Sequence, residues 1–140
     1  MSNTPVEGSG EHPLPLTTKP ISRLTLALFA GASGDHNPIH IDLDYAREAG
    51  AGDVFAHGML SMAYLGRLLT NWVPQGSVRE FSARFASIVR VHERLICTGQ
   101  VIERLERNGE QVARLELTAA NEKGEIKATG EAVVAMPKHG

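Results

Sequence analysis

Residues 58–73 have the pattern of a helix that is apolar around most of its circumference. Leucine, methionine, tyrosine and tryptophan fall on most sides of it, and only Arg67 and Asn71, four residues apart, form a clear polar strip. Such a helix is normally wrapped by other structure, because a surface helix keeps a broad polar face toward water. Pro74 and Gly76 predict its end. The rest of the chain must therefore enclose a long central helix.

The sequence beyond this helix changes to a period of two residues, which is typical of half-buried strands. Asn108-Gly109 and residues 121–124 are turn signals that separate predicted strands at 95–105, 111–120 and 126–136. We predict an α+β fold: a single domain in which an antiparallel sheet curls around the central helix. Pattern alone leaves other α+β arrangements open. The clearest alternation involves Phe81, Ala83, Phe85, Val89 and Val91, and then Ala113, Leu115, Leu117 and Ala119.

The N-terminal half contains shorter elements. Residues 1–12 have few apolar side chains and are predicted to be a flexible tail, with the folded domain spanning 13–140. Ser22 can cap a helix that ends near Gly31 and Gly34, and Asp42 can cap a short helix that ends near Gly50 and Gly52. The first helix is expected to pack through one apolar face formed by Leu24, Ala27 and Leu28. The stretch from 34 to 42 is then a loop.

The composition excludes several classes of function. A chain of 140 residues with 42% hydrophobic residues suits one domain, and a net charge of −2 without a basic stripe argues against a nucleic-acid partner or a membrane surface. No apolar run approaches the ~20 residues of a membrane span, and the N-terminus has no signal-peptide pattern. The single cysteine, Cys97, excludes an internal disulfide and is expected to be buried. We therefore expect a cytoplasmic protein.

The segment from Gly34 to Asp42, with the sequence GDHNPIHID, places two carboxylates, two imidazoles and an amide within nine positions. Pro38 stiffens this loop and favours an extended Asn37, so that Asp35 and His40 can be held in a fixed relation. A carboxylate and an imidazole that converge on one water can perform general acid–base chemistry. That chemistry can add water across a polarised double bond.

A second segment, Ala56-His57-Gly58-Met59-Leu60, opens the central helix. The free N–H groups in the first turn of a helix favour negative charge, and glycine lets a ligand oxygen approach the backbone closely. A thioester carbonyl placed there would have its developing enolate oxygen stabilised by the Gly58 N–H.

Together the two segments resemble the signature of the MaoC-like hydratases, which include (R)-specific enoyl-CoA hydratases and 3-hydroxyacyl-carrier-protein dehydratases. The similarity runs roughly from Ile21 to Met136. It implies a hotdog fold, usually dimeric, in which Asp35 and His40 activate water and Gly58 supplies the oxyanion donor. It also implies an acyl-CoA or acyl-carrier-protein substrate and no metal or other cofactor. The partner can be a second copy or a related hotdog chain.

Three further residues are candidate substrate-binding positions: Asn37, His57 and Met59. Asn37 is expected to support the loop, and the position of His57 before the helix favours an anchoring role over substrate contact. Some family members carry a serine on the central helix where this chain has Gly66, which puts a role for that hydroxyl in doubt.

Alternative interpretations remain open at this point. His36, His40, Asp35 and Asp42 could bind a metal, although Pro38 argues against a helix that would align the two histidines. A hotdog thioesterase or a non-catalytic acyl-binding subunit of a heterodimer are alternative functions. Acyl chain length, carrier and reaction direction do not follow from the sequence.

Overall fold

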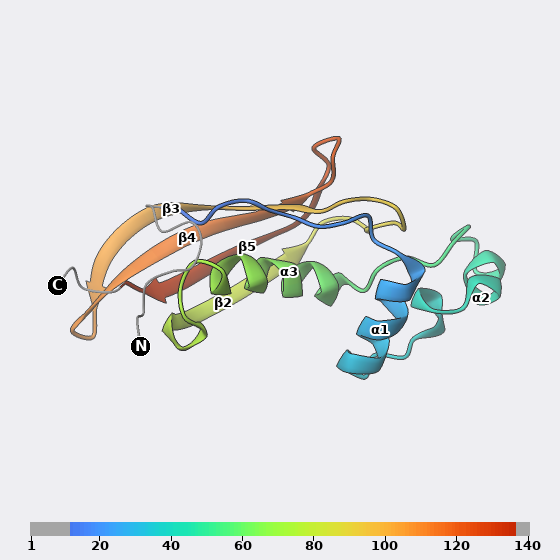
Figure 1. Ribbon diagram of the computed structural model, residues 1–140, viewed down its shortest axis with the longest axis horizontal. Coiled ribbons are helices and arrows are strands. Elements are labelled where there is room, and N and C mark those ends of the chain that lie inside the picture. Colours follow the sequence, from blue (N-terminus) through green and yellow to red (C-terminus); the bar gives the residue numbers. More distant parts are fainter. Residues whose placement is uncertain (1–11, 137–140) are drawn as a thin grey trace.

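A computed structural model describes residues 12–136 of the chain (Figure 1). Residues 1–11, most of the predicted tail, and 137–140 lie outside the described part. The helices are α1 (Arg23–Ser33), α2 (Leu43–Glu48) and α3 (Gly58–Thr70), with short 3₁₀ turns at Pro38–His40 and Gln75–Ser77. The strands are β1 (Leu16–Thr17), β2 (Val78–Phe85), β3 (Ile96–Arg107), β4 (Glu110–Ala120) and β5 (Ile126–Ala135).

The five strands form one antiparallel sheet in the order β1-β3-β4-β5-β2. Both predicted hairpins are present. Asn108 and Gly109 have φ values of 54° and 82°, which is the left-handed conformation that a tight two-residue hairpin turn needs. In the other hairpin, the Oδ1 of Asn121 accepts hydrogen bonds from the N–H groups of Lys123 and Glu125, and Gly124 has a φ of 83°.

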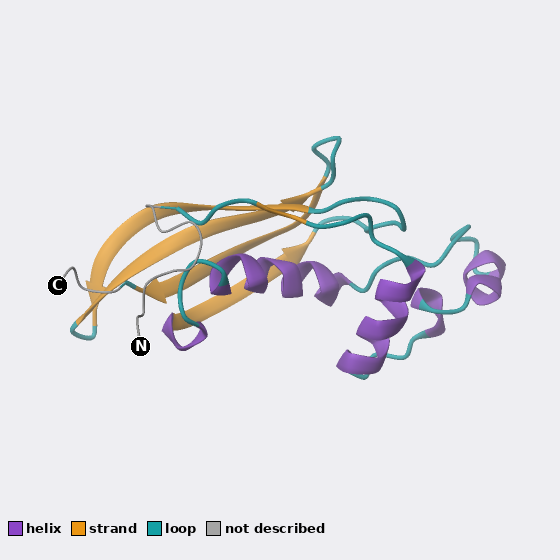
Figure 2. Cartoon of the chain, viewed as in Figure 1, coloured by secondary structure: helices purple, strands orange, loops and turns teal. Residues whose placement is uncertain are grey.

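Helix α3 lies along the inner face of the curved sheet, and α1 and α2 lie beyond one end of the strands (Figure 2). The core-facing leucines of α3 are buried together with alternate residues of the strands. The antiparallel sheet curled around one long helix is the hotdog arrangement that the sequence predicts. The core includes Leu65, Leu68, Leu69, Trp72, Leu95, Leu115, Leu117 and Val134.

The caps of α1 and α2 lie where the sequence places them. The Ser22 hydroxyl accepts from the Thr25 N–H, and Gly34 ends α1 with a φ of 78°. The Asp42 carboxylate accepts from the N–H groups of Asp44 and Tyr45, which fixes the start of α2.

The predicted packing face of α1 is wrong. Leu24 and Leu28 are 67% and 65% exposed, whereas Leu26 and Ala30 are buried. The helix is apolar on both sides, so a stripe of residues three or four apart fits either face. Packing against the core selects the face that the pattern did not favour.

Three boundaries also differ from the prediction. Helix α3 ends at Thr70 rather than near Val73, and the period-two stretch after Phe81 leaves the sheet at Phe85. The segment beyond Phe85 contacts the loop before α3 instead: the Ala56 N–H donates to the Val89 carbonyl at 2.9 Å. Strand β1, which the sequence analysis did not predict, covers part of the β3 edge. Among the described residues, no helix is both long and apolar enough to cross a membrane.

Candidate active site

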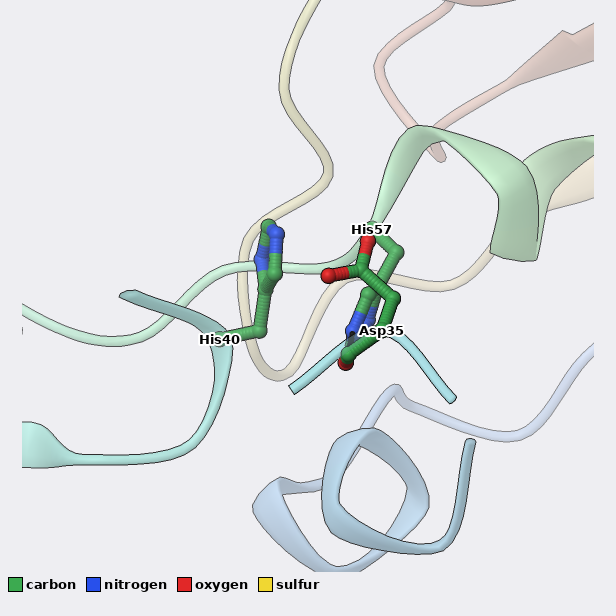
Figure 3. Close-up of side chains that lie close together, drawn as sticks. All are labelled: Asp35, His40 and His57. Atoms are coloured by element: carbon green, nitrogen blue, oxygen red, sulfur yellow. Dashed lines mark hydrogen bonds between the residues drawn. The ribbon is translucent and has the colours of Figure 1, made fainter. Parts of the chain in front are cut away.

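Asp35, His40 and His57 converge from three separate segments (Figure 3). One ligand-type atom from each lies within 4.8 Å of the other two. Asp35 follows the glycine that ends α1, His40 closes the 3₁₀ turn, and His57 stands directly before α3. The fold therefore brings a carboxylate and two imidazoles to the N-terminal end of the central helix.

The loop between Asp35 and His40 is held by its own polar groups. The Asp35 Oδ1 accepts from the Asn37 N–H at 3.3 Å, and the Asn37 Oδ1 accepts from the Ile39 N–H at 3.1 Å. Asn37 is extended and precedes Pro38, which begins the 3₁₀ turn. In this structure the Asn37 side chain supports the loop, and the loop carries Asp35 and His40 to the site.

The tautomer of His40 follows from its partner. Its Nδ1 lies 2.7 Å from the Phe55 carbonyl oxygen, which can only accept, so Nδ1 carries the proton. In the neutral ring Nε2 then has a free lone pair. His40 is thus arranged as a proton acceptor at Nε2.

His57 is 2% exposed and anchors the Asp35 loop. Its Nε2 donates to the Asp35 carbonyl oxygen at 3.0 Å, and its ring stacks on His40 with centroids 3.9 Å apart and planes 28° apart. The Nδ1 is buried without a hydrogen-bond partner among the described residues. The side chain does not cap α3, so His57 holds the two other members of the cluster rather than the helix end.

Two cavities lie on either side of the first turns of α3. The Gly58 pocket, about 270 Å³, is bordered by Gly58 and Ser61 of the helix, by His40 and by the segment 85–89. The Met59 pocket, about 440 Å³, is bordered by Asp35 and is otherwise mostly apolar. Its remaining lining residues are Phe29, Ser33, Met59, Met62, Ala63, Gly66 and Phe81. His40 therefore borders the Gly58 pocket and Asp35 the Met59 pocket.

The glycines of α3 have different surroundings. A Cβ on Gly58 would lie 3.0–3.2 Å from the Phe85 ring, which is too close unless the ring moves. A Cβ on Gly66 would lie 3.4 Å from Phe81, an ordinary contact. A side chain at Gly58 would thus require the Phe85 ring to shift, whereas the space at Gly66 would admit a serine.

The residues that could bind a metal in the structure differ from those that the sequence suggested. Within residues 12–136, only Asp35, His40 and His57 form a group of three such side chains, and His36 and Asp42 do not join it. Three N and O ligands resemble a catalytic zinc site. However, the lone pair of an imidazole nitrogen lies in the plane of its ring. Because the His40 and His57 rings are stacked, their lone pairs are directed side by side rather than toward one metal ion.

Two polar residues near the site are absent from the predicted set. Ser61 is buried on α3, one turn after Gly58, and the spacing of three residues could have identified it. Lys127 is 5% exposed, donates to the Ile88 carbonyl at 2.8 Å and pairs with Glu93 at 3.2 Å. No local pattern in the sequence distinguishes this lysine from a surface residue.

Cys97 and the remaining histidines of the described chain do not belong to the cluster of Asp35, His40 and His57. Burial raises the pKa of the Cys97 thiol to about 12, which keeps it protonated and inert. His92 is exposed, and His12 accepts a hydrogen bond from the Val101 N–H at its Nδ1. His139 lies outside the described residues.

Comparisons with known proteins identify the family of the chain. The chain matches the MaoC like domain over residues 6–123. It is 32% identical over 124 residues to the (R)-specific enoyl-CoA hydratase of Rhodospirillum rubrum, covering 87% of this chain and 84% of that protein. The unliganded R-hydratase PhaJ1 from Pseudomonas aeruginosa has a TM-score of 0.81 at 28% identity, covering 98% of this chain and 88% of the other.

A more distant neighbour shares the fold alone. The ChsH1-ChsH2 complex from Mycobacterium tuberculosis has a TM-score of 0.77 at 17% identity, covering 91% of this chain and 97% of the other.

Proposed function

Since this chain belongs to the MaoC-like family, we propose that it catalyses the reversible hydration of trans-2-enoyl thioesters to (R)-3-hydroxyacyl thioesters. The observation that carries the proposal is the convergence of the Asp35 carboxylate and the His40 ring, each of which borders one of the two cavities beside α3. The similarity to proteins named as (R)-specific hydratases supports the substrate class and the handedness.

The mechanism uses one water held between Asp35 and His40. Its oxygen bonds to C3 of the enoyl group while one member of the pair accepts a proton from it. The electrons of the C2–C3 double bond move toward the thioester carbonyl, which becomes an enolate. The pair then returns a proton to C2, so that the net change is the addition of one water.

The enolate oxygen is placed at the start of α3, against the Gly58 N–H. The His57 side chain makes no capping hydrogen bond at this helix end. The positive end of the helix dipole favours the developing charge. This places the thioester in the Gly58 pocket. We propose that the acyl chain extends into the Met59 pocket, whose lining is mostly apolar.

The three predicted substrate-binding residues take different parts in this arrangement. Met59 borders the acyl chain, since it lines the larger cavity. Asn37 acts through the loop that it supports, and His57 acts through its hydrogen bond to Asp35 and its stack on His40. We propose that the last two position the catalytic pair.

We propose that the working form is a dimer, either of two copies or of this chain with a related hotdog chain. Strand β2 is an edge of the sheet, and the α3 residue Met59 and the β2 residue Phe85 are about half exposed. A second hotdog would cover both the edge and the apolar flank. Sedimentation at micromolar concentration is expected to give twice the chain mass, and a fully active monomer would contradict the proposal.

Loss of ultraviolet absorbance on incubation with crotonyl-CoA and longer enoyl-CoAs tests the proposed reaction. We expect absorbance to fall without release of free thiol. Release of free CoA would instead identify a thioesterase. Inactivity of the chain alone, with activity on adding a related hotdog subunit, would identify a partner subunit.

A further inference from the structure

Ser61 is a buried residue whose hydroxyl makes no hydrogen bond within the described part of the chain and borders a cavity. The residue is 2% exposed, yet among the described residues its hydroxyl makes no hydrogen bond. Serine within a helix commonly bonds back to a carbonyl of the preceding turn. Thr70 on the same helix does so, donating to the Arg67 carbonyl at 3.3 Å. Because Ser61 borders a cavity, its hydroxyl is available to a ligand that enters it.

The position of Ser61 shows where that ligand would lie. Ser61 borders the Gly58 pocket together with Gly58 and His40. Residues three apart share one face of a helix, and helical side chains tilt toward the N-terminus. The Ser61 hydroxyl is therefore directed back along α3 toward the turn that begins at Gly58.

Two independent observations thus concern the same cavity. The first is the start of α3, a helix of 13 residues whose N-terminal end receives no side-chain cap. The second is the unpartnered hydroxyl of Ser61. Both offer hydrogen-bond donors, and what they can share is one oxygen atom that carries negative charge.

We propose that Ser61 is a second oxyanion donor, whose hydroxyl binds the thioester carbonyl oxygen beside the Gly58 N–H. This inference rests on the proposed function, which supplies the thioester. The donor adds most in the transition state, because the carbonyl oxygen becomes an enolate there. Ser61 itself exchanges no proton with the substrate.

The test compares S61A with the wild type on crotonyl-CoA, and T70A serves as a matched control on the same helix outside both cavities. Loss of one hydrogen bond to a developing charge predicts a fall in kcat of about 10- to 100-fold. KM is expected to change much less, and the shape of the pH profile is expected to stay the same. T70A is expected to keep the wild-type kcat.

Stability separates this role from a structural one. S61A removes a hydroxyl that makes no hydrogen bond among the described residues, so its melting temperature is expected to stay close to that of the wild type while kcat falls. S61C, with a weaker donor of similar size, is expected to be intermediate in kcat. A kcat of S61A that is indistinguishable from wild type overturns the inference, as does a loss that only follows a lower melting temperature.

A second readout keeps the inference testable if the proposed function fails. Should the wild type hydrate no enoyl-CoA, calorimetric titration with butyryl-CoA, a saturated thioester, measures carbonyl binding directly. Several-fold weaker binding by S61A is expected. Equal affinity, or no binding by the wild type, overturns the assignment of Ser61.

Discussion

Replacing Asp35 by Asn or His40 by Gln separates chemistry from folding. Each change keeps the approximate shape of the side chain but removes its ability to accept and return a proton. A positioned acid or base contributes about 10²–10⁴ in rate, or roughly 3–5.5 kcal/mol of the activation barrier. Because the two groups act on one water, the double variant is expected to lose little more than the worse single variant.

The structure sets the expected effect of the same variants on stability. Asp35 is exposed and its carboxylate accepts one bond at 3.3 Å, so D35N is expected to cost below about 1 kcal/mol. H40Q loses the bond to the Phe55 carbonyl and the stack on His57, about 1–2 kcal/mol together. H36Q, an exposed histidine of the same loop, is the matched control.

The assay is kcat/KM on crotonyl-CoA beside the melting temperature of each variant. We expect D35N and H40Q to lose turnover while they remain folded at the assay temperature, and H36Q to behave as the wild type. If either D35N or H40Q kept near-wild-type turnover with an unchanged melting temperature, the role assigned to that residue would be refuted.

Three further outcomes are expected. G58A should lower kcat/KM on crotonyl-CoA, because the new Cβ would lie 3.0–3.2 Å from the Phe85 ring and force it to shift; unchanged kinetics would show that the close backbone approach is unnecessary. Prolonged dialysis against EDTA should leave activity intact, since backbone N–H groups polarise the carbonyl; loss of activity that zinc restores would place a metal among Asp35 and its neighbours. Acid should destabilise the fold through Glu93: burial alone would raise the pKa of its carboxyl, but hydrogen bonds from Asn121, the Arg90 N–H and Lys127 outweigh it and lower the pKa. A lowered folded-state pKa stabilises the fold above the unfolded value near 4.5 and loses that contribution as pH falls through the folded value. E93Q should therefore show a weaker acid dependence of its unfolding free energy below about pH 4.5 than the wild type, and equal slopes would contradict this assignment.

The elements with strong local chemistry could be predicted from the sequence. Ser22 and Asp42 satisfy backbone donors of the helices that they begin, and Asn108-Gly109 adopts a turn that few other pairs allow. These effects depend on neighbouring residues alone. The packing of the long α3 against other structure was also predictable from its apolar circumference, although the flank that contains Met59 stays exposed.

The features that depend on tertiary packing could not be predicted. Nothing in the sequence of α1 shows that Leu26 rather than Leu28 faces the core, because both sides of that helix are apolar. The tautomer of His40 depends on the carbonyl of Phe55, 15 residues away. The charge of the buried Lys127 is paired with Glu93, which comes from the segment before β3.

The candidate site lies between these two cases. Its loop and the start of α3 could be recognised because their residue types and spacing are unusual. Their convergence depends on His57, whose hydrogen bond to the Asp35 carbonyl joins the two segments. The sequence suggested that this residue caps or anchors α3, whereas its side chain makes no capping hydrogen bond and instead holds the Asp35 loop.

The stereochemistry of crotonyl-CoA hydration in D₂O tests the central claim most directly. If Asp35 and His40 hold a single water on one face of the enoyl group, the oxygen and the deuteron are delivered from the same side. The product is then expected to be (R)-3-hydroxybutyryl-CoA, labelled at C2 by syn addition. An (S)-3-hydroxy product, or anti addition, would contradict the placement of the water between these two residues.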